Sequence, residues 1–220
     1  MVQASEEIVC YFEKAGNVRH IAKDEIVYMQ GEVSPHIYLI AKGRVRMFFI
    51  GNDGREITYQ IVGEGQLIGE SAFLGHAARP TTICAVNEVT LIACQVKQLK
   101  PYMQESKELN EAILTLLTDN YDFLCAQVRR LTVYDRFQRV ASYLLDQTEE
   151  DKPGVGIVNG ILPYTHEELG VCLNLNRVTV TNVLNRFEKE GLVRLGRNNR
   201  IRKSSSRLLI KRKNTSYNYR

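Results

Sequence analysis

The sequence lacks an uninterrupted apolar run long enough to cross a membrane. Its first residues also lack the basic and then apolar layout of a secretory signal, so we expect a cytoplasmic protein without a membrane partner. Three signatures of enzymes are missing as well: Ser-x-x-Lys, Gly-x-Ser-x-Gly and the phosphate-binding P-loop. These absences predict a protein that is not an enzyme and has no catalytic residues.

Metal-ligand spacings are absent too. The cysteines are scattered, and no two have the C-x-x-C spacing of a zinc or redox site; they are Cys10, Cys84, Cys94, Cys125 and Cys172. The four histidines show no ligand spacing either; they are His20, His36, His76 and His166. We therefore expect no structural metal, and cysteines that are mostly small buried groups in a reducing compartment.

Acidic residues are missing from the end of the chain. From Gly191 onward there are ten Lys or Arg and no Asp or Glu. From Asp135 to the end the count is 16 basic against 9 acidic, whereas the preceding part holds 13 against 16. Lys and Arg displace counterions from phosphates, so a basic C-terminal module indicates a polyanion partner. The alternative is a basic tail that serves only solubility.

The most informative stretch that is present runs from Thr165 to Gly191. Thr165 and Glu168 have the spacing of a capping box, which predicts a helix that ends near Asn174. Asn176 then caps a second helix, whose apolar residues fall on one side at i, i+3, i+4 and i+7; they are Val180, Val183, Leu184 and Phe187. Two short helices joined by such a turn are typical of a unit that enters the major groove of DNA. An ordinary helical hairpin is the alternative.

The other side of the second helix is polar and free of acidic groups. It carries Arg177, Val178, Thr181, Asn182 and Asn185. Arg donates to guanine, Asn pairs with adenine, and Val contacts the methyl group of thymine. This face therefore has the chemistry of a base-reading surface.

Residues up to about 100 predict an all-β domain. Arg44 to Ile50 and Glu56 to Val62 are strands on either side of an Asn-Asp-Gly turn, which is a hairpin signal. In the return strand the apolar groups Ile57, Tyr59 and Ile61 alternate. Frequent glycines between short strands favour a closed or folded-over barrel.

Three segments of this half carry a specific resemblance: residues 31–32, 36–45 and 63–70. They look like the cyclic-nucleotide-binding β-roll. With the helix-turn-helix, the chain resembles the cyclic-AMP receptor and fumarate-nitrate reductase regulator (CRP/FNR) family of bacterial transcription factors over nearly its whole length. The resemblance implies an α+β protein: a β-roll or jelly roll over residues 1–104, a long dimerisation helix over 105–134 and a winged helix-turn-helix over 135–220.

The effector site implied by the resemblance matches the family only in part. In cyclic-AMP binders a Gly-Glu pair meets the ribose and an Arg followed by Ser or Thr holds the phosphate. Gly69, Glu70 and Arg79 match, but Pro80 follows the arginine and has no N–H to donate. The implied effector-binding set is Gly69, Glu70, Ser71, Arg79, Thr81, Thr82, Leu124 and Cys125. Another small molecule is favoured over cyclic AMP, an unoccupied site is the alternative, and no cofactor is assigned.

Other sensing branches of the family fit less well. The iron–sulfur branch needs a cluster of N-terminal cysteines, and only Cys10 is there. The haem branch would need His76, and a lone loop histidine is usually a surface group. A branch that senses chlorinated aromatics shares only the short core at residues 178–180.

A heptad seam follows the β-rich half. Apolar residues step by alternating threes and fours: Leu114, Leu117, Tyr121, Leu124, Val128 and Leu131. A helix packed on its own domain gives a similar stripe. However, two recognition helices related by a two-fold axis read half-sites one turn apart, which favours a homodimer along this seam. Asp135 and Arg139 match the hinge and the start of the DNA module.

Residues 192–202 predict the hairpin of a wing, with arginines placed for phosphate. By family position the DNA-binding residues are Asn176, Arg177, Val178, Thr179, Thr181, Asn182, Arg197 and Arg200. Val178 and Asn182 depart from the best-known pattern, Arg-Glu-x-x-x-Arg. They predict a half-site poorer in G·C than TGTGA, with thymine opposite Val178.

The resemblance implies a ligand-responsive regulator that binds double-stranded palindromic DNA, acts mainly as an activator and contacts RNA polymerase. The alternative is a cyclic-nucleotide-sensing module that acts through a protein partner. The basic wing and the polar outer face of the second helix speak against that alternative, and a steep salt dependence of DNA affinity would separate the two.

Overall fold

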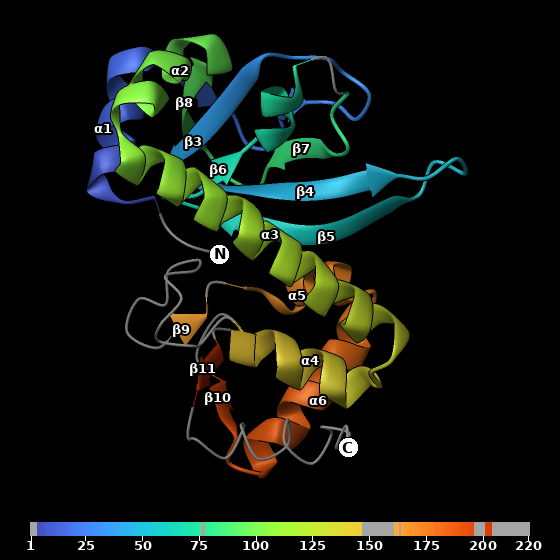
Figure 1. The fold of residues 1–220 in the computed structure, drawn as a ribbon. Coiled ribbons are helices and arrows are strands. Elements are labelled where there is room, and N and C mark those ends of the chain that lie inside the picture. The colour runs from blue at the N-terminus through green and yellow to red at the C-terminus, as the bar shows by residue number, and fades with distance from the viewer. Residues whose placement is uncertain (1–3, 76–77, 147–160, 163, 196–200, 204–220) are drawn as a thin grey trace, which may run out of the picture. The chain divides into compact units, whose positions relative to one another are not determined.

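The computed structural model describes residues 4–75, 78–146, 161–162, 164–195 and 201–203 of the chain. The chain divides into two compact units, Met1–Phe123 and Leu124–Arg220, and the division falls within one long helix. Helices and strands are named as in Figure 1.

The first unit is built on two antiparallel four-stranded sheets. One has the order β1-β8-β3-β6 and the other the order β2-β7-β4-β5. The strands are β1 (Asn17–Ile21), β2 (Ile26–Tyr28), β3 (His36–Lys42), β4 (Arg44–Ile50), β5 (Glu56–Gly63), β6 (Leu67–Ile68), β7 (Thr82–Ala85) and β8 (Val89–Gln95). Residues of both sheets form one apolar core, with Ile40, Val45, Ile83 and Leu91 almost fully buried. Because the core lies between the sheets, the predicted folded-over barrel is confirmed.

The hairpin of β4 and β5 forms as predicted, but one of its faces differs. The register shifts between Met47 and Phe48, so Tyr59 is an extra residue that bulges from β5. A bulge of one residue reverses which side chains point inward. Thr58 is therefore buried and Ile57 is 51% exposed, so the predicted alternation through Ile57 is wrong at that end.

The prediction that the first hundred residues are all-β is also wrong, because helices precede, interrupt and follow the strands (Figure 1). They are α1 (Glu6–Ala15), the 3-10 helix η1 (Glu70–Leu74) and the start of α2 (Val96–Glu105). The Ser5 hydroxyl accepts from the N–H of Ile8 at 3.4 Å and caps α1. Ile8 and Phe12, one turn apart, are buried in a second apolar cluster that includes Ile92 of β8.

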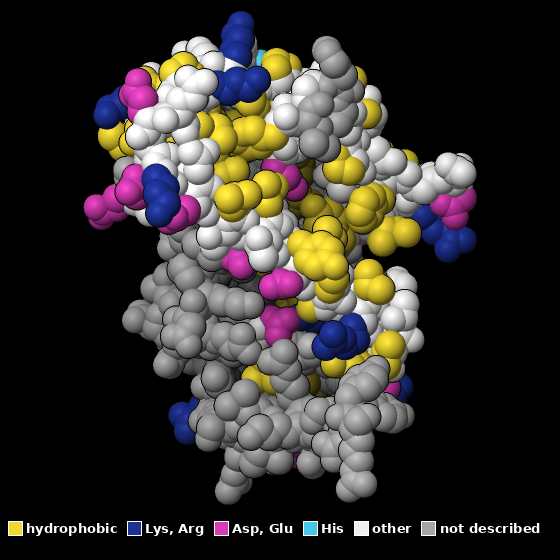
Figure 2. All heavy atoms as spheres, in the orientation of Figure 1, with side chains coloured by type: hydrophobic (Ala, Val, Ile, Leu, Met, Phe, Trp, Pro, Cys, Tyr) yellow, Lys and Arg dark blue, Asp and Glu magenta, His cyan; other side chains and the backbone are white. Residues whose placement is uncertain are grey.

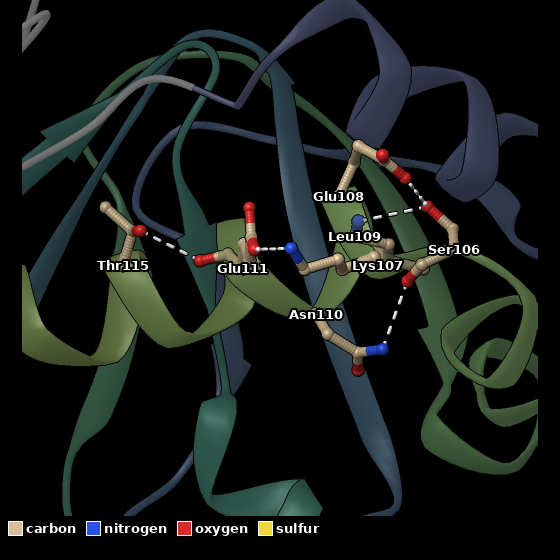
Figure 3. Close-up of polar contacts among 7 residues, drawn as sticks. All are labelled: Ser106, Lys107, Glu108, Leu109, Asn110, Glu111 and Thr115. Carbon is tan, nitrogen blue, oxygen red and sulfur yellow. Dashed lines mark hydrogen bonds and ion pairs between the residues drawn. The ribbon is translucent and has the colours of Figure 1, made fainter.

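The long helix α3 (Lys107–Thr132) is preceded by Ser106, whose hydroxyl accepts from the N–H of Leu109 at 3.1 Å (Figure 3). Leu109, Ile113 and Leu116 are buried in the apolar cluster that contains α1. A second apolar stripe of the same helix remains exposed, and it is the predicted seam. Among the described residues, α3 therefore has one apolar side that packs into the first unit and another apolar side that is exposed.

The second unit is a cluster of short helices with a small sheet. Its elements after α3 are α4 (Arg136–Asp146), β9 (Ile161–Leu162), α5 (His166–Leu173), α6 (Arg177–Lys189), β10 (Val193–Leu195) and β11 (Ile201–Lys203). The sheet has the order β10-β11-β9 and is antiparallel. The antiparallel pairing of β10 and β11 confirms the two predicted strands of the wing, whose predicted turn at 196–199 lies outside the described residues. β9 is a third strand that the sequence did not indicate.

Candidate nucleic-acid interface and barrel site

The turn between α5 and α6 is fixed by side chains that cap both helices. The Thr165 hydroxyl accepts from the N–H of Glu168 at 3.1 Å, and the Glu168 carboxylate accepts from the N–H of Thr165 at 2.7 Å. Asn174 ends α5 in the left-handed region, with φ of 51°. The Asn176 side chain accepts from the N–H of Thr179 at 2.7 Å and starts α6. The predicted capping box and both asparagine roles are confirmed.

Gly170 is a structural requirement of this turn that the sequence did not reveal. A Cβ atom at Gly170 would lie 2.7 Å from the carbonyl oxygen of Leu175. Real Cβ atoms do not approach backbone oxygen so closely, because the contact is within the repulsive range. Glycine therefore allows the turn to fold back closely onto α5.

The two sides of α6 differ as predicted. The four apolar residues are almost fully buried; they are Val180, Val183, Leu184 and Phe187. On the other side Arg177, Asn182 and Asn185 are exposed, and Val178 is 68% exposed. The base-reading candidates therefore lie on the surface of their own unit.

Thr181 departs from the prediction of an outward-facing residue. Its side chain is half-buried, and its hydroxyl lies 2.9 Å from Nδ1 of His166 and donates to the Arg177 carbonyl at 2.9 Å. Thr179 is also half-buried. The hydroxyl of Thr181 thus links α5 to α6.

His166 is buried beside the reading helix. Its Nε2 has no hydrogen-bond partner within the described part of the chain. Burial lowers the pKa of His166, and the nearby Arg177 guanidinium lowers it further. The histidine is therefore neutral in the folded protein near neutral pH.

Acidification is expected to destabilise the second unit through His166. The unfolded chain takes up a proton near the usual pKa of 6.5, whereas the folded unit resists it. Below that value the unfolded state binds more protons, so stability falls as pH decreases toward the lowered folded pKa. Urea unfolding from about pH 7.5 to about pH 5.5 measures this, and His166→Gln should flatten the pH dependence. An equal slope in both proteins would contradict the assignment.

Helix α5 contacts a buried polar network that sequence reasoning missed. Nε2 of Gln127 donates to the Cys172 carbonyl at 2.5 Å, and Nη1 of Arg130 donates to Oε1 of Gln127 at 3.0 Å. Nη2 of Arg130 forms an ion pair with Asp146. This network joins the end of α3 to α4 and α5. The buried charge of Arg130 is paired with Asp146, which offsets the cost of removing it from water.

The hinge residues have defined contacts in the second unit. Oδ1 of Asp135 accepts from the N–H groups of Phe137 and Gln138 at 2.8 and 2.9 Å and so caps α4. Nε and Nη2 of Arg139 donate to the carbonyls of Tyr134 and Leu131 at 2.9 and 3.1 Å. These bonds fix the connection between α3 and α4.

The wing is described in part. Arg194 of β10 is exposed, and the N–H of Leu195 donates to Oε1 of Glu188 on α6 at 2.8 Å. Arg197 and Arg200, the predicted phosphate contacts, lie outside the described residues, as does His76. Their predicted roles stay predictions.

In the barrel the structure gathers the predicted residues of the first unit around Arg79, which is 1% exposed. Nη1 of Arg79 donates to the Gly69 carbonyl at 2.7 Å and to Oγ of Ser71 at 3.1 Å, and Nη2 donates to the His36 carbonyl. Gly69 has φ of 87°, and a Cβ there would lie 3.0 Å from Nη1. Gly69 is therefore needed for two reasons: its backbone is in the left-handed region, and a larger residue would crowd the guanidinium of Arg79.

Arg79 has only neutral acceptors. Among the described residues no carboxylate lies within ion-pair distance of it, and its Nε has no partner. Its guanidinium stacks over the Tyr28 ring, 4.4 Å from the centroid. A buried cation without a counter-charge is costly, so this site favours a ligand with negative charge.

Tyrosines and threonines complete the barrel site. Burial raises the pKa of Tyr28 and of Tyr59 well above the usual value, and the carboxylate of Glu70 adds to the rise. Both rings therefore remain neutral donors. Thr81 and Thr82 are buried, and Oγ1 of Thr82 accepts from the N–H of Gln30 at 2.9 Å. Leu124 and Cys125, which complete the predicted set, are exposed residues of the second unit.

The predicted dimer seam is largely uncovered. Five of its residues are exposed and Leu131 is half-buried; the exposed ones are Leu114, Leu117, Tyr121, Leu124 and Val128. Figure 2 shows hydrophobic side chains gathered over α3 and the β4–β5 hairpin of the first unit. Phe49, Ile50 and Ile57 of that hairpin are also exposed. A patch of this kind marks an interaction surface.

The described ranges contain neither a candidate metal site nor a candidate membrane-spanning helix. No group of three His, Cys, Asp or Glu side chains there is arranged to hold a metal ion. Among the helices of the same ranges, none combines the length and apolar character needed to span a membrane.

Comparison with known proteins assigns both units. The cyclic nucleotide-binding domain family matches residues 18–106, and the Crp-like helix-turn-helix domain family matches residues 138–208. The chain is 27% identical over 196 residues to the cyclic AMP receptor protein of Thermus thermophilus. The aligned region covers 88% of this chain and 86% of that protein.

Solved structures share the fold. FixK2 from Bradyrhizobium japonicum has a TM-score of 0.76 at 18% identity, covering 89% of this chain and 96% of that one. A CooA mutant from Carboxydothermus hydrogenoformans has a TM-score of 0.74 at 20% identity, covering 94% and 91%. The expected α+β fold is confirmed. With matches to a cyclic nucleotide-binding domain and to a Crp-like helix-turn-helix domain, and with regulators among the relatives it matches over most of its length, the chain belongs to the CRP/FNR family of DNA-binding transcription regulators, which are not enzymes.

Proposed function

We propose that the protein is a ligand-responsive homodimer that binds palindromic DNA and activates transcription through contact with RNA polymerase. One observation carries the proposal: α6 buries one side in its unit and leaves Arg177, Val178 and Asn182 exposed on the other. An exposed helix flank with these groups suits the major groove. A regulator of this kind works where the chromosome is, in the cytoplasm.

Within this proposal Arg177, Val178 and Asn182 read bases, while Asn176, Thr179 and Thr181 approach the sugar–phosphate backbone. Arg194 joins the wing contacts, because it is exposed on β10. We assign three functional parts with the bounds predicted from the sequence: an effector domain over 1–104, a dimerisation helix over 105–134 and a DNA-binding domain over 135–220.

Replacing Arg177 by alanine is expected to cost about 1–3 kcal/mol of DNA binding and to relax specificity at one base position. Arg194→Ala should instead weaken all sequences alike, because a phosphate contact carries no sequence information. Binding of labelled palindromes, varied one position at a time, measures both effects. The same set tests for thymine opposite Val178; equal affinity for every base there would disprove that contact.

The homodimer proposal rests on the exposed seam of α3 and on the exposed apolar residues of the β4–β5 hairpin. Heptad spacing suits two parallel helices related by a two-fold axis. Such a pair presents two reading helices to two half-sites, which matches the symmetry of a palindrome.

For the effector we propose a small anion other than cyclic AMP in the barrel, held through Gly69, Glu70, Ser71, Arg79, Thr81 and Thr82. Leu124 and Cys125 stay predicted members of the set by the family resemblance. The unpaired charge of Arg79 supports an anion. Pro80, which follows Arg79 and has no N–H to donate, disfavours the cyclic phosphate. Native mass spectrometry of the purified protein identifies a bound effector.

A further inference from the structure

A cavity of the first unit is distinct from the barrel site. It opens between the start of α1, strand β6 and the first turns of α3, and it shares no residue with the set around Arg79. Its lining is Ala4, Ser5, Ile8, Leu67, Ala112, Thr115 and Leu116.

The size of the cavity suits one ring. Its volume is about 180 Å³. An apolar cavity of about 150 Å³ in another protein stays dry and binds benzene. Ile8, Leu67 and Leu116 are almost fully buried and form the floor, while Ser5 and Thr115 are exposed and lie at the mouth.

The lining carries no charged side chain, so it selects against ions. The two hydroxyls at the mouth already have partners: Oγ of Ser5 accepts from the N–H of Ile8, and Oγ1 of Thr115 donates to the Glu111 carbonyl at 2.8 Å (Figure 3). Lys107, on the same helix, is paired with Glu111 at 3.2 Å (Figure 3) and is not part of the lining. A carboxylate in this cavity would be buried without a counter-charge.

We propose that this cavity is a binding site for a neutral, ring-sized apolar molecule of the benzene or phenol type. A ring fills the floor, and a single hydroxyl of the ligand at the mouth can donate to Oγ1 of Thr115, which keeps its acceptor capacity. The occupant contacts the turns of α3 that carry Leu114 and Leu117 on their exposed side.

Methyl NMR of the full-length protein tests the site directly. Benzene and phenol are expected to shift the methyl signals of Ile8, Leu67 and Leu116 in a saturable manner. Benzoate is expected to bind at least about tenfold more weakly than phenol, because its charge has no partner. Shifts that do not saturate, or equal affinity for benzoate and phenol, would overturn the proposal.

Two matched variants separate this site from general adsorption. Thr115→Leu and Thr118→Leu change the same residue type on α3, and both hydroxyls donate to the carbonyl four residues earlier, at 2.8 and 2.9 Å. Only Thr115 lines the cavity. Thr115→Leu is expected to weaken phenol binding at least about fivefold and Thr118→Leu to leave it unchanged.

Ala112→Leu provides an independent arm, because its side chain extends into the cavity and takes up ring space. It is expected to abolish the saturable shifts, with circular dichroism confirming the fold. If Ala112→Leu does not fold, the threonine pair decides alone. Equal affinity in both threonine variants, or retained binding in a folded Ala112→Leu protein, contradicts the site.

Discussion

The double variant Leu114→Glu/Val128→Glu is expected to be a monomer that has lost about 10²- to 10⁴-fold of its affinity for a palindromic site. Leu114 and Val128 are 63% and 61% exposed, so the fold of each unit tolerates the change. In a parallel pair each substitution places two carboxylates opposite one another in the seam, where apolar contact is replaced by repulsion.

Analytical ultracentrifugation measures the assembly, and titration of a full palindrome and a single half-site measures binding. The matched control is Leu114→Met/Val128→Ile, which keeps both positions apolar and should retain the dimer. A glutamate variant that still sediments as a dimer and binds the palindrome like the wild type would show that the seam of α3 does not hold two copies together.

The helix-turn-helix formed by α5 and α6 could be predicted from the sequence because the residues that determine it are close together in the chain. Each helix cap joins two residues that are three positions apart: Thr165 with Glu168, and Asn176 with Thr179. Each cap is therefore determined within one helical turn. The buried stripe from Val180 to Phe187 spans two turns of one helix. Such short-range patterns depend little on the rest of the chain.

The features that were missed depend on partners far along the chain. The bulge at Tyr59 exists because β5 must pair with β4, so a strict alternation through Ile57 could not anticipate it. Arg79 donates to the carbonyl of His36, 43 residues earlier. Because every residue has a backbone carbonyl, the sequence does not show which one accepts this hydrogen bond. Helix α1 is different: Ser5 before Ile8 and Phe12 was a readable signal.

The apolar residues of α3 show why the seam remained ambiguous in the sequence. Leu109, Ile113 and Leu116 also follow helical spacing, and they are the ones buried in the first unit. Leu114 and Leu117, shifted by one position, are exposed. Periodicity detects both stripes but not which one its own domain covers, because that choice is made by α1 and the sheet.

Phe187→Ala is expected to destabilise the second unit by about 3–5 kcal/mol and to abolish DNA binding with it. Phe187 is fully buried, and its ring lies 6.4 Å from that of Phe137 on α4. Removing the ring leaves a cavity between α4 and α6, so the recognition helix loses the support that holds its exposed flank in place. Chemical unfolding of the second unit, followed together with DNA affinity, measures both effects.

A pair of valines on α6 separates support from reading. Val183 is buried and Val178 is exposed, so the same change to alanine acts on opposite sides of one helix. Val183→Ala should cost about 2 kcal/mol of stability, since it removes buried methyl groups and leaves a small cavity. Val178→Ala should leave stability unchanged and reduce the preference for thymine at its base position. If Val178→Ala instead destabilises the unit and leaves sequence preference intact, the exposed side of α6 is not the surface that reads DNA.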